Sequence, residues 1–309
     1  MLRAGLLRAA TSPRVRRVLE RTPSTRVVVN RFVAGESAAE AIAACHRLIR
    51  RGCMVTLDYL GEDTTSLTQA RSVVTHYHEV LSGLRTAGIA QQVEMSLKLS
   101  ALGQALSTDG ESVALDHARE IASTARDCGT SITVDMENHL TTDSTLRVVG
   151  RLREDFPTTG AVIQAYLHRS PEDCRMLAHP GSRVRLCKGA YREPSAVALQ
   201  DREDIRQSYV KCAGTLMSGG ATPLLATHDP RLITQIRRLV VTHDLSRDDF
   251  EFQMLYGIRP NEQERLVADG FHVRVYVPFG EEWYGYLMRR MAERPANVGL
   301  FLRSLTSRN

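Results

Sequence analysis

Five polar residues near the end of the chain recur at the spacing of one helix face. They are Tyr286, Arg289, Arg290, Glu293 and Asn297. At about 100° per residue these side chains fall within an arc of roughly 100°, and apolar residues such as Leu287 and Met288 lie opposite. Two guanidinium groups with a carboxylate one turn on can bind a small carboxylate ligand, because arginine offers planar paired donors. The same spacing also fits an exposed helix face held by ion pairs within the helix.

Further polar residues come where predicted strands end. Only three of the 40 Lys and Arg residues are lysines, and two of them, Lys98 and Lys188, occupy such positions. The others are Asp135, Gln164, Arg185, Gly189, Ala190, Tyr191, Thr227, His228, Asp229, Gln253, Leu255 and Tyr276. In a parallel barrel this end of the strands carries the active site. Taken singly, Asp135 could be a satisfied acid at a strand end, and His228 could cap the helix that follows.

Eight short runs rich in β-branched and apolar residues are predicted to be the strands that position these groups. They span residues 54–59, 93–99, 131–136, 161–166, 184–187, 223–226, 250–254 and 272–279. Helices are predicted between them at 67–84, 116–128, 142–153, 196–216, 231–243 and 261–268. This alternation indicates parallel strands with right-handed crossovers. Eight repeats favour an α/β fold of the closed (β/α)₈ TIM-barrel type over an open doubly wound sheet.

The length of 309 residues fits one barrel domain at 51–309, which includes a C-terminal helix over the barrel mouth, preceded by an extension at 1–50 expected to be helical. Residues 1–31 hold eight arginines against Glu20, a charge of +7, so the rest of the chain sums to 5 − 7 = −2. The extension could be a helical cap over the bottom or side of the barrel, an organellar presequence, or a segment that contacts an anionic membrane surface. Nucleic-acid binding is disfavoured, because the basic stretch lacks interleaved aromatic residues.

Composition and motifs exclude several other classes. Hydrophobic residues at 43% and charged residues at 24% describe an ordinary globular protein without an apolar run of the roughly 18 residues that span a bilayer. Six scattered cysteines predict neither a disulfide framework nor a zinc site, and therefore a reducing intracellular compartment. The sequence has neither a glycine-rich dinucleotide loop nor a Walker loop, and a bound metal is not expected. A nucleotide cofactor would bind instead through backbone amides of the turn at 188–190 and the loops around it.

Seven motifs, in order along the predicted strands, resemble the proline dehydrogenase family, the FAD-dependent (β/α)₈-barrel enzymes that open proline catabolism. The motifs are Ser-Leu-Lys-Leu-Ser at 96–100, Thr-Val-Asp-Met-Glu at 133–137, Gln-Ala-Tyr at 164–166, Arg-Leu-Cys-Lys-Gly-Ala-Tyr at 185–191, Ala-Thr-His-Asp at 226–229, Gln-Met-Leu-Tyr-Gly at 253–257 and Tyr-Leu-Met-Arg-Arg-Met-Ala-Glu at 286–293. The resemblance covers the chain from about residue 50 to its end. It resembles the single-activity form of the family rather than the bifunctional one.

The resemblance implies oxidation of L-proline to 1-pyrroline-5-carboxylate, with electrons passing through FAD to a quinone. By the family pattern, Arg289, Arg290 and Lys98 bind the proline carboxylate, and Glu293 orients the arginine pair. Leu255, Tyr276 and Tyr286 enclose the apolar ring, Asp135 fixes Lys98, and Arg185 stabilises negative charge on the flavin. The residues implied to hold the cofactor are Met136, Gln164, Arg185, Lys188, Gly189, Ala190, Tyr191, Thr227, His228 and Gln253. A cytoplasmic protein, in one reading peripheral at the inner face of the membrane, is expected.

One position departs from the family pattern. Arg-Pro-Ala at 294–296 replaces the more usual Asn-Thr-Ala, and Pro295 is predicted to end the helix early and to move Asn297 off the polar face. The residues alone leave two other functions open. A lysine in the barrel mouth, Lys98 or Lys188, also suits a Schiff-base aldolase, and the arginine pair also suits a barrel that binds a small carboxylate without catalysis.

Overall fold

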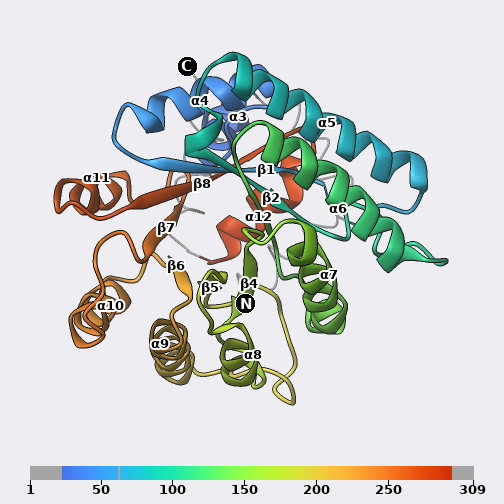
Figure 1. The fold of residues 1–309 in the computed structure, drawn as a ribbon. Helices are drawn as coiled ribbons and strands as arrows, with labels where there is room; N and C mark the ends of the chain where they lie inside the picture. The colour runs from blue at the N-terminus through green and yellow to red at the C-terminus, as the bar shows by residue number, and fades with distance from the viewer. Residues whose placement is uncertain (1–22, 62, 294–309) are drawn as a thin grey trace.

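Eight parallel strands form a nearly closed barrel in the computed structural model, which describes residues 23–61 and 63–293, the side chains of 23–25, 27–28 and 289–293 excepted (Figure 1). The strands are β1 Met54–Tyr59, β2 Val93–Leu97, β3 Ile132–Val134, β4 Ala161–Gln164, β5 Arg183–Cys187, β6 Thr222–Ala226, β7 Glu251–Leu255 and β8 Val273–Phe279. Hydrogen bonds join them in the order β3-β2-β1-β8-β7-β6-β5-β4. The predicted TIM-barrel fold is therefore confirmed.

Gly160, just before β4, brings the two ends of this sheet together. The amide of Val134 donates to the Gly160 carbonyl, and the Gly160 amide donates to Ile132, both at 2.9 Å. A Cβ at position 160 would stand 2.2 Å from the Thr133 hydroxyl, so only glycine lets the chains approach this closely. A parallel bridge between Thr133 and Gly160 results, and it distinguishes the barrel from an open sheet.

Helices surround the barrel and follow the strands in alternation (Figure 1). They are α3 Pro23–Phe32, α4 Ala38–Ile49, α5 Leu67–Thr86, α6 Gly110–Asp127, α7 Thr142–Asp155, α8 Ser170–Leu177, α9 Arg202–Ser218, α10 Pro230–Thr242, α11 Pro260–Ala268 and α12 Trp283–Glu293, with 3₁₀ turns η1 Ala90–Gln92 and η2 His139–Thr141. Three predictions differ from the structure. Helix α8 was not predicted, α6 begins six residues before the expected 116, and the expected helical start at 196–201 is a loop.

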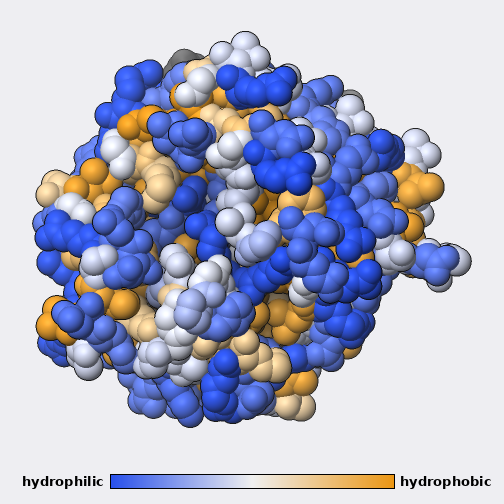
Figure 2. Space-filling view, in the orientation of Figure 1, coloured by the Kyte–Doolittle hydropathy of each residue, from blue (hydrophilic) through white to orange (hydrophobic). Residues whose placement is uncertain are grey.

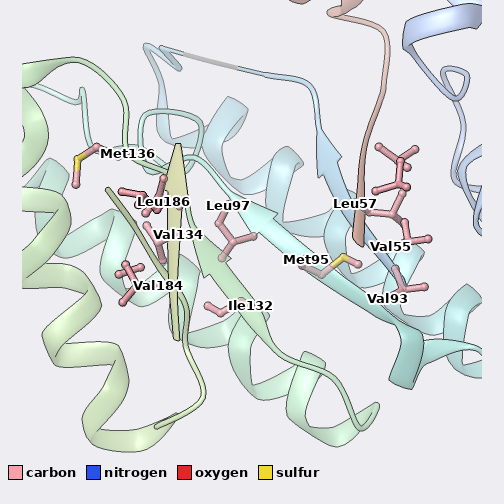
Figure 3. Packing of buried hydrophobic residues seen from close by; sticks show 14 of the residues in the cluster. Val55, Leu57, Val93, Met95, Leu97, Ile132, Val134, Met136, Val184 and Leu186 are labelled. Carbon is pink, nitrogen blue, oxygen red and sulfur yellow. The ribbon is translucent and has the colours of Figure 1, made fainter. Parts of the chain in front are cut away.

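The apolar core lies mainly between the strands and the helices. Val55, Leu57, Met95, Leu97 and Val134 are all buried there, and Figure 3 shows them along neighbouring strands. Because side chains alternate along a strand, the residues between these positions point into the barrel. Those residues are largely polar, so burial of apolar surface outside the ring stabilises the barrel while its interior is left for charged groups.

The described part of the N-terminal extension lies at two places. Helix α4, which begins with a capping box between Ser37 and Glu40, packs on the outside of β1 and β8. Helix α3 lies instead beside α12 near the C-terminal end of β8, where the amide of Ala34 donates to the Pro278 carbonyl at 2.9 Å. A second apolar cluster joins Phe32 of α3 to Trp283 of α12. Helix α4 thus lies on the outside of the barrel and α3 beside α12, and the role expected for the basic residues 1–31 as a cap stays a prediction, because most of them lie outside the described residues.

The surface seen in Figure 2 is mostly hydrophilic, with hydrophobic residues in small separate groups. Within the described ranges, none of the helices combines the length and the apolar character needed to cross a bilayer. Residues 1–22, which carry most of the basic charge of the extension, lie outside the described part of the chain.

Candidate active site

Polar residues at every second position of six chain segments fill the inside of the barrel. The inward residues are Thr56 and Asp58 of β1, Glu94 and Ser96 of β2 with Lys98 after it, Thr133 of β3 with Asp135 after it, Arg183 and Arg185 of β5, Glu251 and Gln253 of β7, and Arg274 and Tyr276 of β8. Strand register sets them in layers, since Thr56 is level with both Glu94 and Tyr276. Four acids and four bases among them balance in charge.

Lys98 lies between two carboxylates at the C-terminal end of the strands. Its ammonium donates to both oxygens of Asp58 at 2.6 Å and lies 3.7 Å from Asp135. The hydroxyl of Tyr276 is 3.5 Å from the same nitrogen. Burial raises the pKa of Asp58, although the attraction of Lys98 opposes it. The structure therefore places Asp135 beside Lys98 and adds Asp58, which sequence reasoning missed, as the nearer partner.

The side chain of Tyr276 joins this pair to Arg185. Its hydroxyl donates to Asp135 Oδ2 at 2.7 Å, and the Arg185 guanidinium carbon lies 5.3 Å from the centre of its ring. Burial, together with the negative charge of Asp135, raises the pKa of Tyr276 well above its usual value. Tyr276 is therefore a neutral hydrogen-bond donor whose hydroxyl is already engaged by Asp135.

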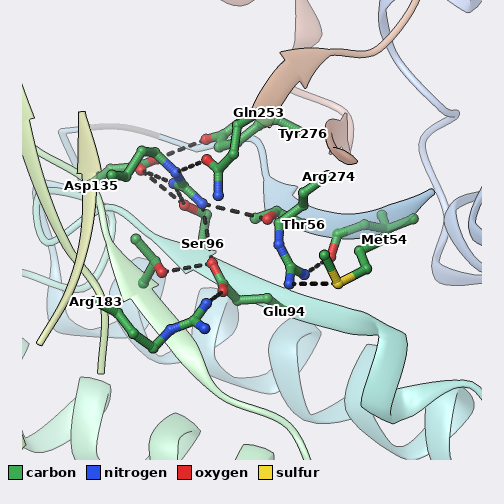
Figure 4. A network of polar contacts seen from close by, with 12 residues as sticks. Met54, Thr56, Glu94, Ser96, Asp135, Arg183, Gln253, Arg274 and Tyr276 are labelled. Atoms are coloured by element: carbon green, nitrogen blue, oxygen red, sulfur yellow. Dashed lines mark hydrogen bonds and ion pairs between the residues drawn. The ribbon is translucent and has the colours of Figure 1, made fainter. Parts of the chain in front are cut away.

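Arg185 is the centre of a polar network, because its guanidinium donates to Ser96, Glu94, Asp135 and Gln253. Figure 4 labels Asp135, Gln253 and Tyr276 toward one end of this network and Glu94 and Arg183 at the other. Arg185 Nη1 donates to Asp135 Oδ1 and to the Ser96 hydroxyl, each at 2.8 Å. Burial opposes the charge of Arg185, but Asp135 and Glu94 outweigh it and raise the pKa. The structure thus brings Lys98, Asp135, Arg185 and Tyr276, all predicted from sequence, into one cluster.

Gln164 at the end of β4 connects two loops of the rim. Its amide nitrogen donates to the Glu137 carbonyl at 2.7 Å, and its oxygen accepts from the Ala190 amide at 3.4 Å. Met136 is buried in the same region. Gly189 has φ +111°, and a Cβ there would stand 2.2 Å from the ring of Tyr166. A glycine is therefore required at 189 by the backbone conformation and by Tyr166, whether or not a cofactor approaches the turn.

Lys188 and His228 project from the rims of β5 and β6. The Lys188 ammonium lies 2.8 Å from Asp229 Oδ2. The amide of Leu255 donates to Nε2 of His228 at 2.8 Å, so in the neutral ring the proton is on Nδ1. The cap of α10 is Asp229, which accepts from the Arg231 amide at 3.0 Å, and not His228.

The remaining predicted residues have mixed surroundings. Thr227 is buried, and its hydroxyl accepts from the Asp229 amide at 3.1 Å. Gln253 lies deep in the barrel, with its oxygen 2.6 Å from Arg185 Nε and its amide nitrogen 2.6 Å from Glu251. Tyr191 is half-buried in the loop after β5, and Leu255 packs against the second apolar cluster. The interactions of Gln253 are thus with the interior network.

Donors and amides from β4, β5 and β6 meet at one rim, beside the cluster around Arg185. The Lys188 ammonium, beside Asp229, and the His228 ring are the kinds of group that contact an anionic nucleotide, whereas the Gln164 amide nitrogen already donates to the Glu137 carbonyl. The residues at this rim therefore fit a nucleotide cofactor. Among the described residues, no group of three or more His, Cys, Asp or Glu side chains could hold a metal ion.

Helix α12 carries the predicted carboxylate clamp. Figure 1 shows α12 within the outline of the strand ring. Tyr286 is buried in the second apolar cluster with Leu287 and Met288. The side chains of Arg289, Arg290 and Glu293, and all of Asn297, lie outside the described part of the structure. The clamp, and the expected early helix end at Pro295, stay predictions.

The structure adds five charged residues that sequence reasoning missed, Asp58, Glu94, Arg183, Glu251 and Arg274. Each stands two residues from another inward polar group, as Glu94 does from Ser96. A polar residue at every second position of an otherwise apolar strand is the signal that could have revealed them.

Comparison with known proteins gives consistent matches. The family model described as proline dehydrogenase matches residues 41–303. Proline dehydrogenase 1 of Bacillus subtilis is 40% identical over 284 residues, which cover 91% of each chain. The proline dehydrogenase of Deinococcus radiodurans is 37% identical over 307 residues, which cover 99% of this chain and 98% of that protein.

A solved structure has the same fold. Proline utilization A (PutA) from Bdellovibrio bacteriovorus, inactivated by N-propargylglycine, matches with a TM-score of 0.80 and 26% identity over 87% of this chain. The present chain covers 33% of that protein, so it corresponds to about a third of the larger PutA chain.

Proposed function

The chain belongs to the proline dehydrogenase family, and we propose that it oxidises L-proline to 1-pyrroline-5-carboxylate with FAD as cofactor and a quinone as electron acceptor. The observation that carries this proposal is the cluster of Lys98, Asp135, Arg185 and Tyr276, in which Lys98 and Arg185 are buried and Asp135 and Tyr276 partly so. The cluster lies at the C-terminal end of the strands, where barrel enzymes carry out their chemistry. All four residues fall within the range that the family model matches.

Charge balance supports a role for α12 in binding the substrate. Lys98 and Arg185 are already compensated by Asp58 and Asp135, so the cluster is neutral before a ligand enters. A proline carboxylate adds one negative charge, which needs further cations to avoid a desolvation penalty. Arg289 and Arg290 of α12 would supply them, with Glu293 orienting the pair and Lys98 assisting. Leu255, Tyr276 and Tyr286 would contact the apolar ring.

Oxidation of the ring C–N bond to an imine removes a hydride from carbon and a proton from nitrogen. FAD, when bound, would supply the group that takes up the two electrons. Arg185 is permanently cationic and held rigidly, so it would stabilise negative charge on the reduced cofactor without having to reorganise. Met136, Gln164, Lys188, Gly189, Ala190, Tyr191, Thr227, His228 and Gln253 are the residues proposed to hold the cofactor.

The ion pairs argue against a Schiff-base aldolase. Such an enzyme needs an amine that is free to attack a carbonyl carbon, whereas the Lys98 nitrogen is paired with Asp58 at 2.6 Å and the Lys188 nitrogen with Asp229 at 2.8 Å. A barrel that only binds a carboxylate would keep the arginine pair but would need no cofactor. Proteins with these three functions differ in their visible absorbance and in the product that a chemical trap captures.

The purified protein should contain FAD, identified by chromatography after denaturation, and should convert L-proline to a cyclic imine that an aromatic aminoaldehyde traps. D-proline is the control for stereospecific binding. Borohydride trapping of a carbonyl substrate on Lys98 or Lys188 would support the aldolase instead. Absence of both cofactor and product would refute the proposal and would favour a protein that binds a carboxylate without catalysis.

Contact with a membrane would bring the site near a quinone. The observation that supports membrane contact is the charge of +7 in residues 1–31. Co-sedimentation with anionic vesicles at low salt, lost at high salt, would support this peripheral contact. Equal sedimentation with neutral vesicles would count against it.

A further inference from the structure

The guanidinium of Arg185 is held by acceptors on every one of its N–H groups. Nε donates to Gln253, Nη1 donates to Ser96 and Asp135, and Nη2 donates to Glu94 at 3.1 Å and to Thr56 at 3.4 Å. These acceptors come from β1, β2, β7 and the end of β3. The position of Arg185 is therefore set by the whole barrel, with Asp135 and Glu94 as its two charged partners.

Glu94 is the partner on the side away from the mouth. It is 2% exposed, and its Oε1 also accepts from the Thr133 hydroxyl at 2.6 Å, while Oε2 pairs with Arg183. Burial opposes the charge of Glu94, but Arg274, Arg183 and Arg185 outweigh it and lower the pKa to about 2. Glu94 is therefore an anion fixed by three separate contacts, and it lies between Arg185 and Arg183 in a line of alternating charges that begins at Asp135.

We propose that Glu94 is a positioning residue, which anchors Arg185 from within the barrel and keeps its charge beneath the Tyr276 ring, at the place where the proposed reaction needs it. The inference rests on the proposed function for its chemical consequence. Without the carboxylate of Glu94, the attraction of Asp135 acts on Arg185 unopposed from the other side. The guanidinium would then move toward the mouth, and three arginines would share one fewer anion.

The test compares Glu94→Gln, which keeps the shape and removes the charge, with Glu111→Gln. Glu111 forms an ion pair with Arg147 at 2.6 Å on the surface. In the flavin-loaded protein we expect Glu94→Gln to shift the midpoint potential of the flavin. We also expect it to slow flavin reduction at saturating L-proline about ten- to a hundredfold, the loss typical of one charge-assisted bond. Flavin content, and affinity for a proline-like carboxylate that cannot be oxidised, should stay close to wild type, and Glu111→Gln should change none of these.

The double variant Glu94→Gln/Arg183→Met covers the case in which Glu94→Gln does not fold. It removes one anion and one cation together, so the interior stays neutral while Arg185 loses its lower anchor. The same loss of reduction rate is expected in this variant. If either folded variant keeps the wild-type potential and reduction rate and is changed only in its melting temperature, Glu94 is merely structural and the proposal is wrong.

A measurement without flavin separates this inference from the proposed function. Slow hydrogen exchange of the Arg185 Nε–H, followed by NMR and assigned with Arg185→Lys, reports the anchoring directly. We expect this exchange to become faster in Glu94→Gln and to be unchanged in Glu111→Gln. A protein that lacks flavin but shows this difference would contradict the proposed function alone, and unchanged exchange would overturn the role of Glu94.

Discussion

Replacing Asp58 with asparagine should destabilise the fold much more than replacing an exposed aspartate in an ion pair of the same length. Asp58 and Lys98 are 2.6 Å apart, and their side chains are 2% and 10% exposed. The matched control is Asp143, which is also 2.6 Å from its partner Arg169 but is 71% exposed. The two substitutions remove the same charge at the same distance, so they differ chiefly in burial.

The expected loss of unfolding free energy depends on the surroundings of the cation that each substitution leaves without its partner. Removing one partner of a buried ion pair typically costs about 3–5 kcal/mol, because the other charge remains desolvated. Asp135, at 3.7 Å from Lys98, would compensate in part, so the lower end, about 3 kcal/mol, is expected for Asp58→Asn. An exposed pair contributes about 0–1 kcal/mol, with up to about 1 kcal/mol more for an acid in the first turn of a helix, as Asp143 is in α7.

Urea unfolding of the purified protein, followed by far-ultraviolet circular dichroism, measures both free energies of unfolding. Asp58→Asn should lower the midpoint clearly more than Asp143→Asn, with the slope of the transition unchanged. Equal losses in the two variants would refute the claim that Lys98 is held as a buried cation by Asp58. It would also reopen the aldolase alternative, which needs a neutral lysine.

Three further predictions concern other parts of the site. The fold lowers the pKa of Glu94 from 4.5 to about 2. At about 1.4 kcal/mol per unit of pKa shift, the ionised carboxylate adds roughly 3 kcal/mol to the free energy of unfolding. This stabilisation is fully present above pH 4.5 and is lost as the pH falls to about 2. Acid unfolding curves should therefore show Glu94→Gln approaching wild type at low pH, and a constant difference would contradict the assignment. In Gly189→Val the side chain would meet the ring of Tyr166, so the turn at 188–190 must move with its amides and the folded protein should retain little FAD; full flavin content would show that the turn does not hold the cofactor. Arg289→Met or Arg290→Met should weaken binding of a non-oxidisable proline-like carboxylate by roughly one to two orders of magnitude, while wild-type affinity in both would exclude this face of α12 as the clamp.

Local patterns predicted the eight strands because each is a short β-branched run between turn residues. They did not predict α8, because Ser170–Leu177 is short and shows few of the apolar positions that mark a helix face. Residues 196–201 read as helical from composition, but Ala198 forms a bridge with Leu167 and the amide of Leu199 donates to Tyr166. Contacts between distant segments override local propensity there.

In the site, too, some features follow from local sequence patterns and others depend on contacts between distant segments. Lys98, Asp135, Arg185 and Tyr276 could be predicted, because strand ends at one rim of a barrel must converge. The partners of Glu94 and Arg274 could not be predicted from sequence, since the pairing of Glu94 with Arg183 and of Arg274 with Glu251 depends on strand stagger and on how the side chains reach inside the barrel. Register places Gln253 level with Arg274 and beside Glu251 and Arg185, partners that the sequence did not indicate, and its expected contact with the cofactor stays a prediction.

The most direct test of the account is anaerobic titration of the purified protein with L-proline, followed by visible absorbance. If the cluster around Lys98 and Arg185 is a proline-oxidising site, the oxidised flavin spectrum should bleach completely as substrate is added. One cyclic imine should form for each flavin reduced, and D-proline should have no such effect. A flavin spectrum that persists with excess L-proline, in protein shown to be folded and loaded with FAD, would contradict the central claim.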